Sequence, residues 1–371
     1  MTTPAERAVA HVRSLAAPGD VPPGLFESGA SGVSPGVFES GPGDVPPGVF
    51  ESGAGGVSPG LLESGAGDVS PGLLESGAIT VSFHPDRLLA DGSSVAQHLA
   101  AEGRYRSQFE TGISNGGLTA YSGGDRDVWE RRMFAGAYPS SVTVDRPIYG
   151  GLNLAGYPDG ASPRFGSCHL ILDPAVARRT TFSHGDSVTE PTVVGTADTF
   201  GGIWAALLDE VARTGRALGL PAAGPAEWVA ALGVPRTAAG RCLDDYVEAQ
   251  VHGGLDLRAD VTAVVADPSF RGTPTGDLLA SLAPSVRWHP GFVLAPGEFP
   301  AELRGPVAPR LAAHLARRYG VDLIDAALVG RAAGSVVRSP QEWASFGPAA
   351  EVLQQLKYVW HILVLRGHPT R

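Results

Sequence analysis

Lysine and cysteine are both scarce in this sequence. Lys357 is the one lysine among 371 residues, so arginine supplies nearly all of the positive charge. With 50 glycines and 31 prolines, this usage is typical of a bacterial genome rich in G and C, so arginine by itself says little about phosphate binding. The two cysteines, Cys168 and Cys242, are too few for a disulfide framework or a thiolate zinc site. Cys168 lies within an apolar strand pattern, which favours a buried and inert thiol.

The sequence also lacks a long apolar stretch. No run approaches the roughly 18 apolar residues of a membrane span. Glu6, Arg7 and Arg13 interrupt the N-terminus, where a signal peptide would have its apolar core. We therefore expect a cytoplasmic protein without membrane contact, and export by a route that cleaves no signal peptide stays open.

A twelve-residue unit is repeated five times between Val21 and Ala78. Each unit contains Pro-Gly, two apolar residues and Glu-Ser-Gly, with the prolines at positions 23, 35, 47, 59 and 71. Pro-Gly favours a type II turn, but one apolar pair per unit cannot offset the entropy of ordering the other residues. We therefore predict that residues 1–78 form a disordered arm. Alternatively, the repeats present one short motif to a partner with several matching pockets.

The formal net charge of −10 is concentrated in these repeats, which carry seven acidic residues and no basic one. Residues 1–20 are balanced, so the rest of the chain carries only −3. A nearly neutral body argues against a dedicated duplex-DNA binder, although it permits a local anion site. We also expect that deleting residues 1–77 leaves folding and any catalysis intact.

The hydrophobic pattern after the repeats predicts an α+β fold. Ile79–Phe83 alternates and predicts a first strand, and the apolar spacing of Val95 and Leu99 up to Gly103 predicts a helix. Short strands are predicted within 146–154, 166–173, 178–187 and 246–252, whereas 260–266 fits a strand or a short helix. Amphipathic spacing predicts a helix over Thr199–Leu218.

The last hundred residues look helical, with segments over 306–319, 322–333 and 340–365. We therefore expect a split, mostly antiparallel sheet with flanking helices over residues 79–270, and a mainly helical part over 271–371 packed on it as scaffold.

One segment, Tyr105–Gly124, is rich in turn-forming residues yet varied in side chains, which is typical of binding loops. Arg106, Glu110 and the Ser114-Asn-Gly-Gly motif could line a pocket there. In contrast, Gly150-Gly151 and Gly201-Gly202 lack the setting of a dinucleotide-binding fingerprint, and no phosphate-binding loop of the Walker type is present.

Four histidines, at positions 84, 169, 184 and 252, occur at strand ends or turns near other polar residues, which indicates a site. One interpretation is metal binding. His84 with Asp86, and His184 with Asp186, form two His-x-Asp pairs whose side chains would share one strand face. A divalent metal held by these nitrogen and oxygen ligands would activate water in a metal-dependent hydrolase.

A second interpretation comes from a resemblance. His84 to Arg87, Thr180-Thr-Phe-Ser183 and Glu248-Ala-Gln250 resemble a loose form of the three-part signature of ADP-ribosyltransferases. In that family Arg or His stands on the first strand, a Ser-Thr-Ser element follows, and a Gln/Glu-x-Glu turn comes last. Here the glutamate precedes the glutamine, which reverses the usual order.

The resemblance implies an enzyme that uses NAD as co-substrate and transfers ADP-ribose to an unknown acceptor, for which a protein is one candidate. It makes Glu248 the carboxylate that stabilises the cationic ribose, with Ser183 on the ribose and His84 at the cofactor. A carboxylate held beside the ribose stabilises the positive charge that develops there as nicotinamide leaves. The remaining cofactor-binding residues would be Arg87, Arg146, Tyr149, Thr181 and Gln250, with arginine suited to the pyrophosphate.

Residues 79–270 as a whole more closely resemble an uncharacterised bacterial domain family, which implies no mechanism. Three functions therefore stay open: an ADP-ribosyltransferase-like enzyme, a metal-dependent hydrolase and a non-catalytic binding protein. Convergence of Glu248, Ser183 and His84 on one cleft with Arg87 or Arg146 would favour the first. Convergence of His84, His184 and Asp186 would favour the second.

Overall fold

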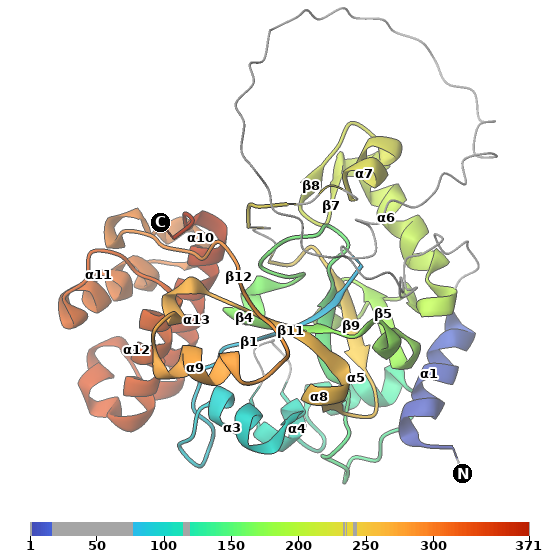
Figure 1. Ribbon diagram of the computed structural model, residues 1–371, viewed down its shortest axis with the longest axis horizontal. Helices are drawn as coiled ribbons and strands as arrows, with labels where there is room; N and C mark the ends of the chain where they lie inside the picture. Colours follow the sequence, from blue (N-terminus) through green and yellow to red (C-terminus); the bar gives the residue numbers. More distant parts are fainter. Residues whose placement is uncertain are drawn as a thin grey trace, which may run out of the picture.

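The computed structural model describes residues 2–16, 77–113, 119–232, 234, 236–239 and 243–370. The predicted Pro-Gly repeats and the Ser114-Asn-Gly-Gly motif lie outside these residues. Within them, a central sheet is flanked by helices, and a block of C-terminal helices packs at one end (Figure 1). The predicted α+β class with a mostly antiparallel sheet and a helical C-terminal part is confirmed.

The largest sheet among the described residues has eight strands in the order β12-β11-β4-β1-β3-β9-β5-β6. All neighbours are antiparallel except β11 and β12, which are parallel. The strands are β1 Ile79–Phe83, β3 Ile148–Leu152, β4 Cys168–Leu172, β5 Thr180–His184, β6 Val194–Thr196, β9 Val247–Val251, β11 Val261–Ala266 and β12 Val286–Trp288. Two small ribbons accompany it, formed by β2 Arg104–Tyr105 with β10 Leu255–Asp256 and by β7 Arg216–Ala217 with β8 Leu220–Pro221.

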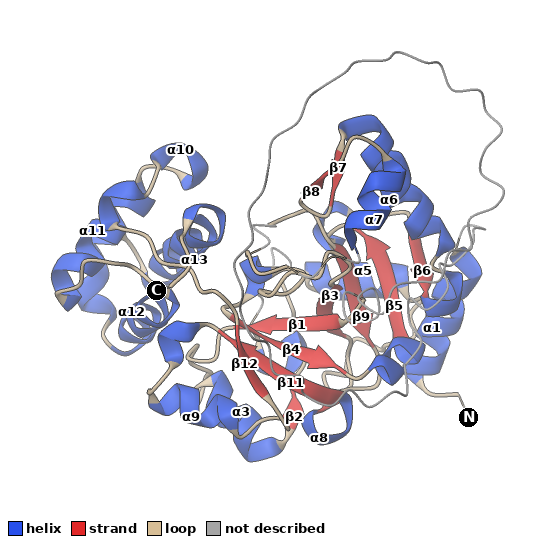
Figure 2. Ribbon diagram, turned by 45° about the horizontal axis from the view of Figure 1, so that its top comes forward, coloured by secondary structure: helices blue, strands red, loops and turns tan. Residues whose placement is uncertain are grey.

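The sheet divides between β1 and β3. These strands pair only through Ile79 with Leu152 and Thr80 with Gly151, whereas β3 and β9 pair along five residues. Figure 2 shows the consequence, because β5 and β9 run at a steep angle to β1 and β4. The end of β1 and the start of β3 therefore diverge within the sheet.

The α-helices are α1 Pro4–Leu15, α3 Val95–Glu102, α4 Gln108–Thr111, α5 Asp125–Met133, α6 Gly201–Thr214, α7 Pro225–Leu232, α8 Leu257–Asp260, α9 Pro274–Ala280, α10 Ala301–Arg304, α11 Val307–Tyr319, α12 Ala326–Arg338 and α13 Ala349–Arg366. Short 3₁₀ turns are η1 Pro163–Phe165, η2 Pro174–Arg179, η3 Ser187–Thr189, η4 Ala197–Thr199, η5 Pro268–Phe270, η6 Pro296–Glu298 and η7 Pro340–Phe346. Among the described helices, none combines the length and the apolar character that crossing a membrane demands.

Capping residues set the ends of the predicted helices. Ser94 accepts a hydrogen bond from the Gln97 amide and starts α3, and Gly103 ends it in the left-handed conformation. Gly215 ends α6 in the same way, three residues before the predicted end. The helix predicted over 340–365 is wrong as one element, because Gly347, at a φ of 119°, and Pro348 separate η7 from α13.

Helix α1 corrects the predicted boundary of the N-terminal arm. Thr3 and Glu6 form a capping box, and Ala8, Val9 and Val12 are buried. Ala8 and Val12 belong to a second apolar cluster with Trp129, Met133, Phe134, Ala137, Tyr138 and Val194. Residues 4–15 are therefore folded against the body beside β6, where Figure 1 shows them in blue, and the prediction of disorder is wrong for them.

This packing reverses the expectation that the N-terminal residues are dispensable. Val12→Ala is expected to lower the free energy of unfolding by about 1.5–3 kcal/mol, because it removes two fully buried methyl groups. Leu15→Ala, on the exposed side of the same helix, should change it by less than about 0.5 kcal/mol. Denaturant unfolding of the full chain measures both, and equal stabilities would show that α1 does not contribute.

Candidate functional site

A pocket opens where β1 and β3 diverge. Ser82, Phe83 and His84 come from β1 and its end, and Pro147 to Gly150 come from the start of β3. The space holds about 1050 Å³, including its open mouth.

Two glycines of β3, Gly150 and Gly151, allow close packing around this strand before β1 and β3 separate. A Cβ on Gly150 would lie 2.4 Å from the Thr80 carbonyl oxygen, so any side chain there would force β1 and β3 apart. A Cβ on Gly151 would lie 2.8 Å from the Ala161 Cβ, in the segment that packs over this pair. The glycine pair thus serves strand packing, as its lack of a dinucleotide-binding setting indicated.

The pocket is rich in cationic side chains and aromatic rings. Arg87, Arg104, Arg106 and Arg126 line it, together with His84 and His98. Asp186 and Glu248 are the carboxylates in the lining. Rings and aliphatic side chains cover the rest, namely Phe83, Leu89, Val95, Leu99, Tyr105, Ile113, Ile148, Tyr149, Phe165 and Tyr246. The lining therefore suits a ligand that is partly aromatic and partly anionic.

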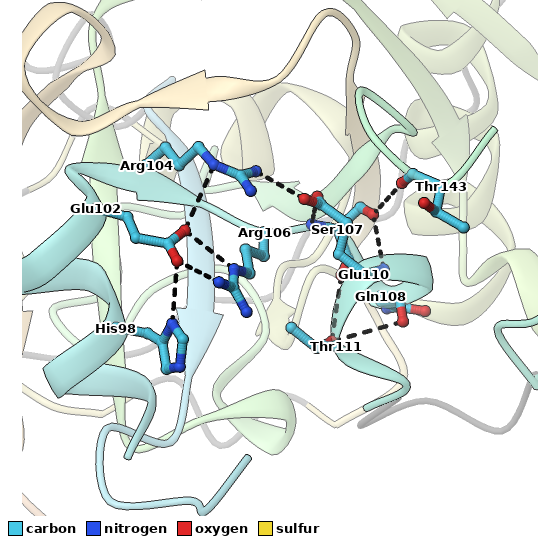
Figure 3. Close-up of polar contacts among 9 residues, drawn as sticks. All are labelled: His98, Glu102, Arg104, Arg106, Ser107, Gln108, Glu110, Thr111 and Thr143. Atoms are coloured by element: carbon cyan, nitrogen blue, oxygen red, sulfur yellow. Dashed lines mark hydrogen bonds and ion pairs between the residues drawn. The ribbon is translucent and has the colours of Figure 1, made fainter. Parts of the chain in front are cut away.

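An ion-pair network joins α3, β2 and α4 at one wall of the pocket (Figure 3). Glu102 pairs with Arg106, whose Nε donates to it at 3.0 Å, and lies 3.3 Å from His98 Nδ1. Arg104 Nη1 lies 2.8 Å from Glu110 Oε1. Arg106 lines the pocket, as predicted, whereas Glu110 does not.

Glu248 lies on β9 with its carboxylate buried at the pocket. Its exposed fraction is 4%, and its Oε2 accepts from the Ser187 amide at 3.3 Å and the Ser187 hydroxyl at 3.2 Å. The Tyr246 hydroxyl lies 3.4 Å from the same oxygen. Burial raises the pKa of Glu248 to about 7, Arg126 opposes this rise, and Asp186 adds to it. A carboxyl that titrates near neutrality in a pocket is a candidate for chemistry.

A line of buried side chains supports Glu248 from behind. Gln250 Nε2 donates to Glu248 Oε1 at 3.0 Å, and Thr181 donates to Gln250 Oε1 at 2.8 Å. Thr181 has one proton, so its 2.9 Å contact with His252 Nε2 makes that ring nitrogen the donor. His252 Nδ1 then accepts from Tyr138 at 2.7 Å. Each hydrogen bond in this series of side chains is therefore donated in the direction of Glu248.

This arrangement corrects three predicted site residues. Thr181, Ser183 and Gln250 do not line the pocket, and each is completely buried. Ser183 accepts from Gln250 at 3.2 Å and donates to the Gly185 carbonyl at 3.1 Å. They hold the Glu248 carboxylate in place and are not positioned to contact a ligand.

Arg146 is likewise a structural residue. Its guanidinium is fully buried, pairs with Asp127 at 2.9 Å and Glu130 at 2.6 Å, and donates to the Val142 and Pro139 carbonyls. It fixes α5 to the start of β3 and does not line the pocket. The structure does not position Arg146 for the predicted cofactor contact, because each of its guanidinium nitrogens already donates to the protein.

His84, Arg87 and Tyr149 do line the pocket, as predicted for cofactor-binding residues. Burial, with Arg87 and Lys357 nearby, lowers the pKa of His84 to about 3, so its imidazole is neutral at physiological pH. Its ring meets Trp360 of α13 edge-to-face at 5.4 Å. The Tyr149 hydroxyl donates to Glu130 at 2.8 Å, while its ring lies 4.1 Å from the Arg126 guanidinium.

The four residues of the predicted metal site do not converge. Asp86 packs against Gly330 of α12, where any Cβ would overlap its carboxylate. His184 lies 3.1 Å from Glu210, away from His84, and lines a different cavity. Within the part of the chain that the structure describes, no cluster of three or more His, Cys, Asp or Glu side chains could hold a metal ion. His169, which lies under Gly160, and Cys168 are buried in β4.

Sequence reasoning missed Arg126, Ser187 and Tyr246. Arg126 lies on α5, where charged residues occupy both faces and no apolar period indicates which side chains turn inward. Several polar atoms in the pocket have no hydrogen-bond partner among the described residues, namely Ser82 Oγ, Gln108 Oε1, Arg126 Nε and Asp186 Oδ2. Unpartnered buried polar atoms cost free energy, so these atoms are available to bond to water or to a polar ligand in the pocket.

Residues 78–366 match the model of a protein family described as a protein of unknown function, DUF3626. This confirms the expectation of an uncharacterised domain family and extends it through the C-terminal helices, well past residue 270. A search of curated proteins finds no match to the chain. The resemblance to ADP-ribosyltransferases stays a prediction.

The buried ion pairs of Arg146 generate a test of its corrected role. Arg146→Ala is expected to lower the free energy of unfolding by about 3–5 kcal/mol, because it leaves Asp127 and Glu130 buried and unpaired. Arg131→Ala, at the half-exposed arginine 3.7 Å from Asp127, should cost less than about 0.5 kcal/mol. Unchanged stability of the Arg146 variant would contradict the structural role and favour the predicted role in ligand binding.

Proposed function

Since this chain belongs to the DUF3626 family of proteins of unknown function, its activity has to be inferred from the pocket itself, and we propose an ADP-ribosyltransferase-like enzyme. It would cleave NAD at the nicotinamide-ribose bond and transfer ADP-ribose to an acceptor. The proposal rests on one observation above all: His84, Tyr149 and Glu248 reach one pocket from the neighbouring strands β1, β3 and β9.

The chemistry assigned to Glu248 follows from its surroundings. Positive charge develops on the ribose as nicotinamide leaves, and a desolvated carboxylate stabilises such charge more strongly than one in water. The cationic nicotinamide ring of bound NAD would also favour the ionised form of this carboxyl. A carboxylate held by Ser187 and Gln250 needs no reorganisation when the charge forms.

The cationic part of the pocket suits the diphosphate of NAD. Arg87, in the loop after β1, and Arg126, on α5, both line the pocket. Guanidinium groups bind phosphate oxygens through paired hydrogen bonds, and Arg126 Nε has no hydrogen-bond partner among the described residues. The aromatic rings of the lining offer surfaces for the adenine or nicotinamide ring.

The predicted residues then divide into two groups. His84, Arg87, Tyr149 and Glu248 would contact NAD, with neutral His84 able to donate one hydrogen bond and accept another. Ser183, Thr181 and Gln250 would act only by holding Glu248. This division differs from the resemblance, which places Ser183 on the ribose.

Glu248→Gln tests the proposal directly. Nicotinamide release from NAD by the purified protein is expected to fall at least about a hundredfold, because the amide carries no charge to stabilise the ribose cation. NAD binding measured by calorimetry should persist, since the amide keeps the shape of the side chain. Glu302→Gln, at an exposed position on α10, serves as the matched control and should keep full activity. Absence of both nicotinamide release and NAD binding in the unchanged protein would refute the proposal.

The pH dependence of nicotinamide release provides a second test. The pKa of Glu248 is raised to about 7 by burial, so the required carboxylate is lost as the pH falls through that value. Activity should therefore rise with pH and level off above about pH 8. Asp186→Asn should move this rise to lower pH, because Asp186 raises the pKa of Glu248. A rise centred near pH 4.5, the ordinary glutamate range, would contradict this assignment.

A further inference from the structure

Arg126 lines the pocket and contacts both Tyr149 and Ser187. Its guanidinium lies 4.1 Å from the ring of Tyr149 on β3, and its Nη1 donates to the Ser187 hydroxyl at 2.5 Å. That hydroxyl in turn donates to Glu248 Oε2 at 3.2 Å. One charged side chain from α5 is thus linked through a single serine to the carboxylate on β9.

The hydroxyl of Ser187 carries one proton, which fixes the direction of this link. Because the proton goes to Glu248, the Ser187 oxygen accepts from Arg126. A hydroxyl that accepts from a cation becomes a stronger donor, since neighbouring hydrogen bonds polarise one another. The ionised form of Glu248 gains from both the bond and the charge behind it.

We propose that Arg126 is a positioning residue that holds the Glu248 carboxylate at the pocket and keeps it ionised through Ser187. Its place in catalysis rests on the proposed function, but its effect on Glu248 does not. Arg126 is 3% exposed, so solvent only weakly screens the attraction between its guanidinium and the Glu248 carboxylate.

The other charged and titratable groups around Glu248 do not replace Arg126. Asp186, at the start of η3, raises the pKa of Glu248. Tyr246 and Tyr149 are neutral, since burial raises the pKa of each phenol well above its usual value. Gln250 donates a hydrogen bond without a charge. Arg164 pairs with Asp244 and lies 3.7 Å from Asp186 rather than against Glu248. Among these groups, Arg126 is the cation that lowers the pKa of Glu248.

The test follows the titration of Glu248 by NMR in full-length protein carrying carboxyl-labelled glutamate. The Glu248 signal is the one that disappears in Glu248→Gln. We expect a midpoint near pH 7 in the unchanged protein, and a midpoint about one to three units higher in Arg126→Met, because the opposing cation is gone. Ser187→Ala should raise the midpoint by less, since the charge remains but the bond is lost.

Arg131→Met is the matched control, because Arg131 lies on the same helix but is half exposed and pairs with Asp127. It should leave the midpoint unchanged. Arg126→Lys keeps a cation without the forked guanidinium and should give a midpoint between those of the unchanged protein and Arg126→Met. Thermal unfolding checks that each variant is folded.

An Arg126→Met midpoint equal to that of the unchanged protein would overturn the proposal. If that variant does not fold, unchanged midpoints in both Ser187→Ala and Arg126→Lys would overturn it equally. The rise of nicotinamide release with pH should shift with the midpoint in each folded variant. A protein that neither binds NAD nor releases nicotinamide refutes the proposed function, while the titration still decides the role of Arg126.

Discussion

The strands β1 and β3 approach so closely at Thr80 and Gly150 that a Cβ on this glycine would lie 2.4 Å from the Thr80 carbonyl oxygen. Beyond this point the two strands no longer pair. If the two strands paired along their whole length, their backbone groups would bond to each other and no opening would remain between them. Divergence instead leaves an opening inside the sheet, with rigid strands on both sides. Side chains placed at its rim, such as His84 and Tyr149, are held by the sheet rather than by flexible loops.

The second constraint is the free-energy cost of burying the Glu248 charge in this opening. A buried carboxyl such as Glu248 ionises only if nearby donors replace its lost hydration. Ser187, Gln250 and Tyr246 donate to Glu248, and Ser187 in turn accepts from Arg126 of α5, so the position of α5 matters. Arg146 fixes that helix from one side through Asp127 and Glu130. On another side, helix α1 packs in one apolar cluster with Trp129 and Met133 of α5. Residues remote from the pocket thereby hold the helix that carries Arg126 to it.

The sequence predicted those parts of the fold that depend on local pattern. Alternation identified Ile79–Phe83, and the glycine after Leu99 marked the end of α3. The pattern failed where tertiary contacts decide. Helix α1 is short and only three of its residues are buried, so its apolar signal is weak beside the adjacent repeats. Glycine and proline at 347 and 348 were read as part of a longer helix, although together they end one.

The candidate site shows the same limit. His84 and Glu248 could be selected because their residue types at strand ends suit chemistry, and both do line the pocket. Alternation along β9 assigns Glu248 and Gln250 to one face, but it cannot tell which of them reaches the opening. Arg146 and Arg126 could not be distinguished by sequence, since each is an arginine among charged neighbours. Only the fold shows that one is enclosed by two carboxylates and the other borders the pocket.

The C-terminal helices bear on this site more directly than a scaffold would. Trp360 of α13 meets the His84 ring edge-to-face, and its indole donates to the Pro163 carbonyl at 2.9 Å. Gly330 of α12 receives the Asp86 side chain, which no other residue there would allow. Both contacts fix the segment that follows β1, which carries His84 and Arg87 to the pocket. Loss of this packing would free the His84 imidazole to take up protons, because burial is the main cause of its low pKa. The match of the family model through residue 366 is consistent with this dependence, since a domain ending near residue 270 would leave one wall of the site without support.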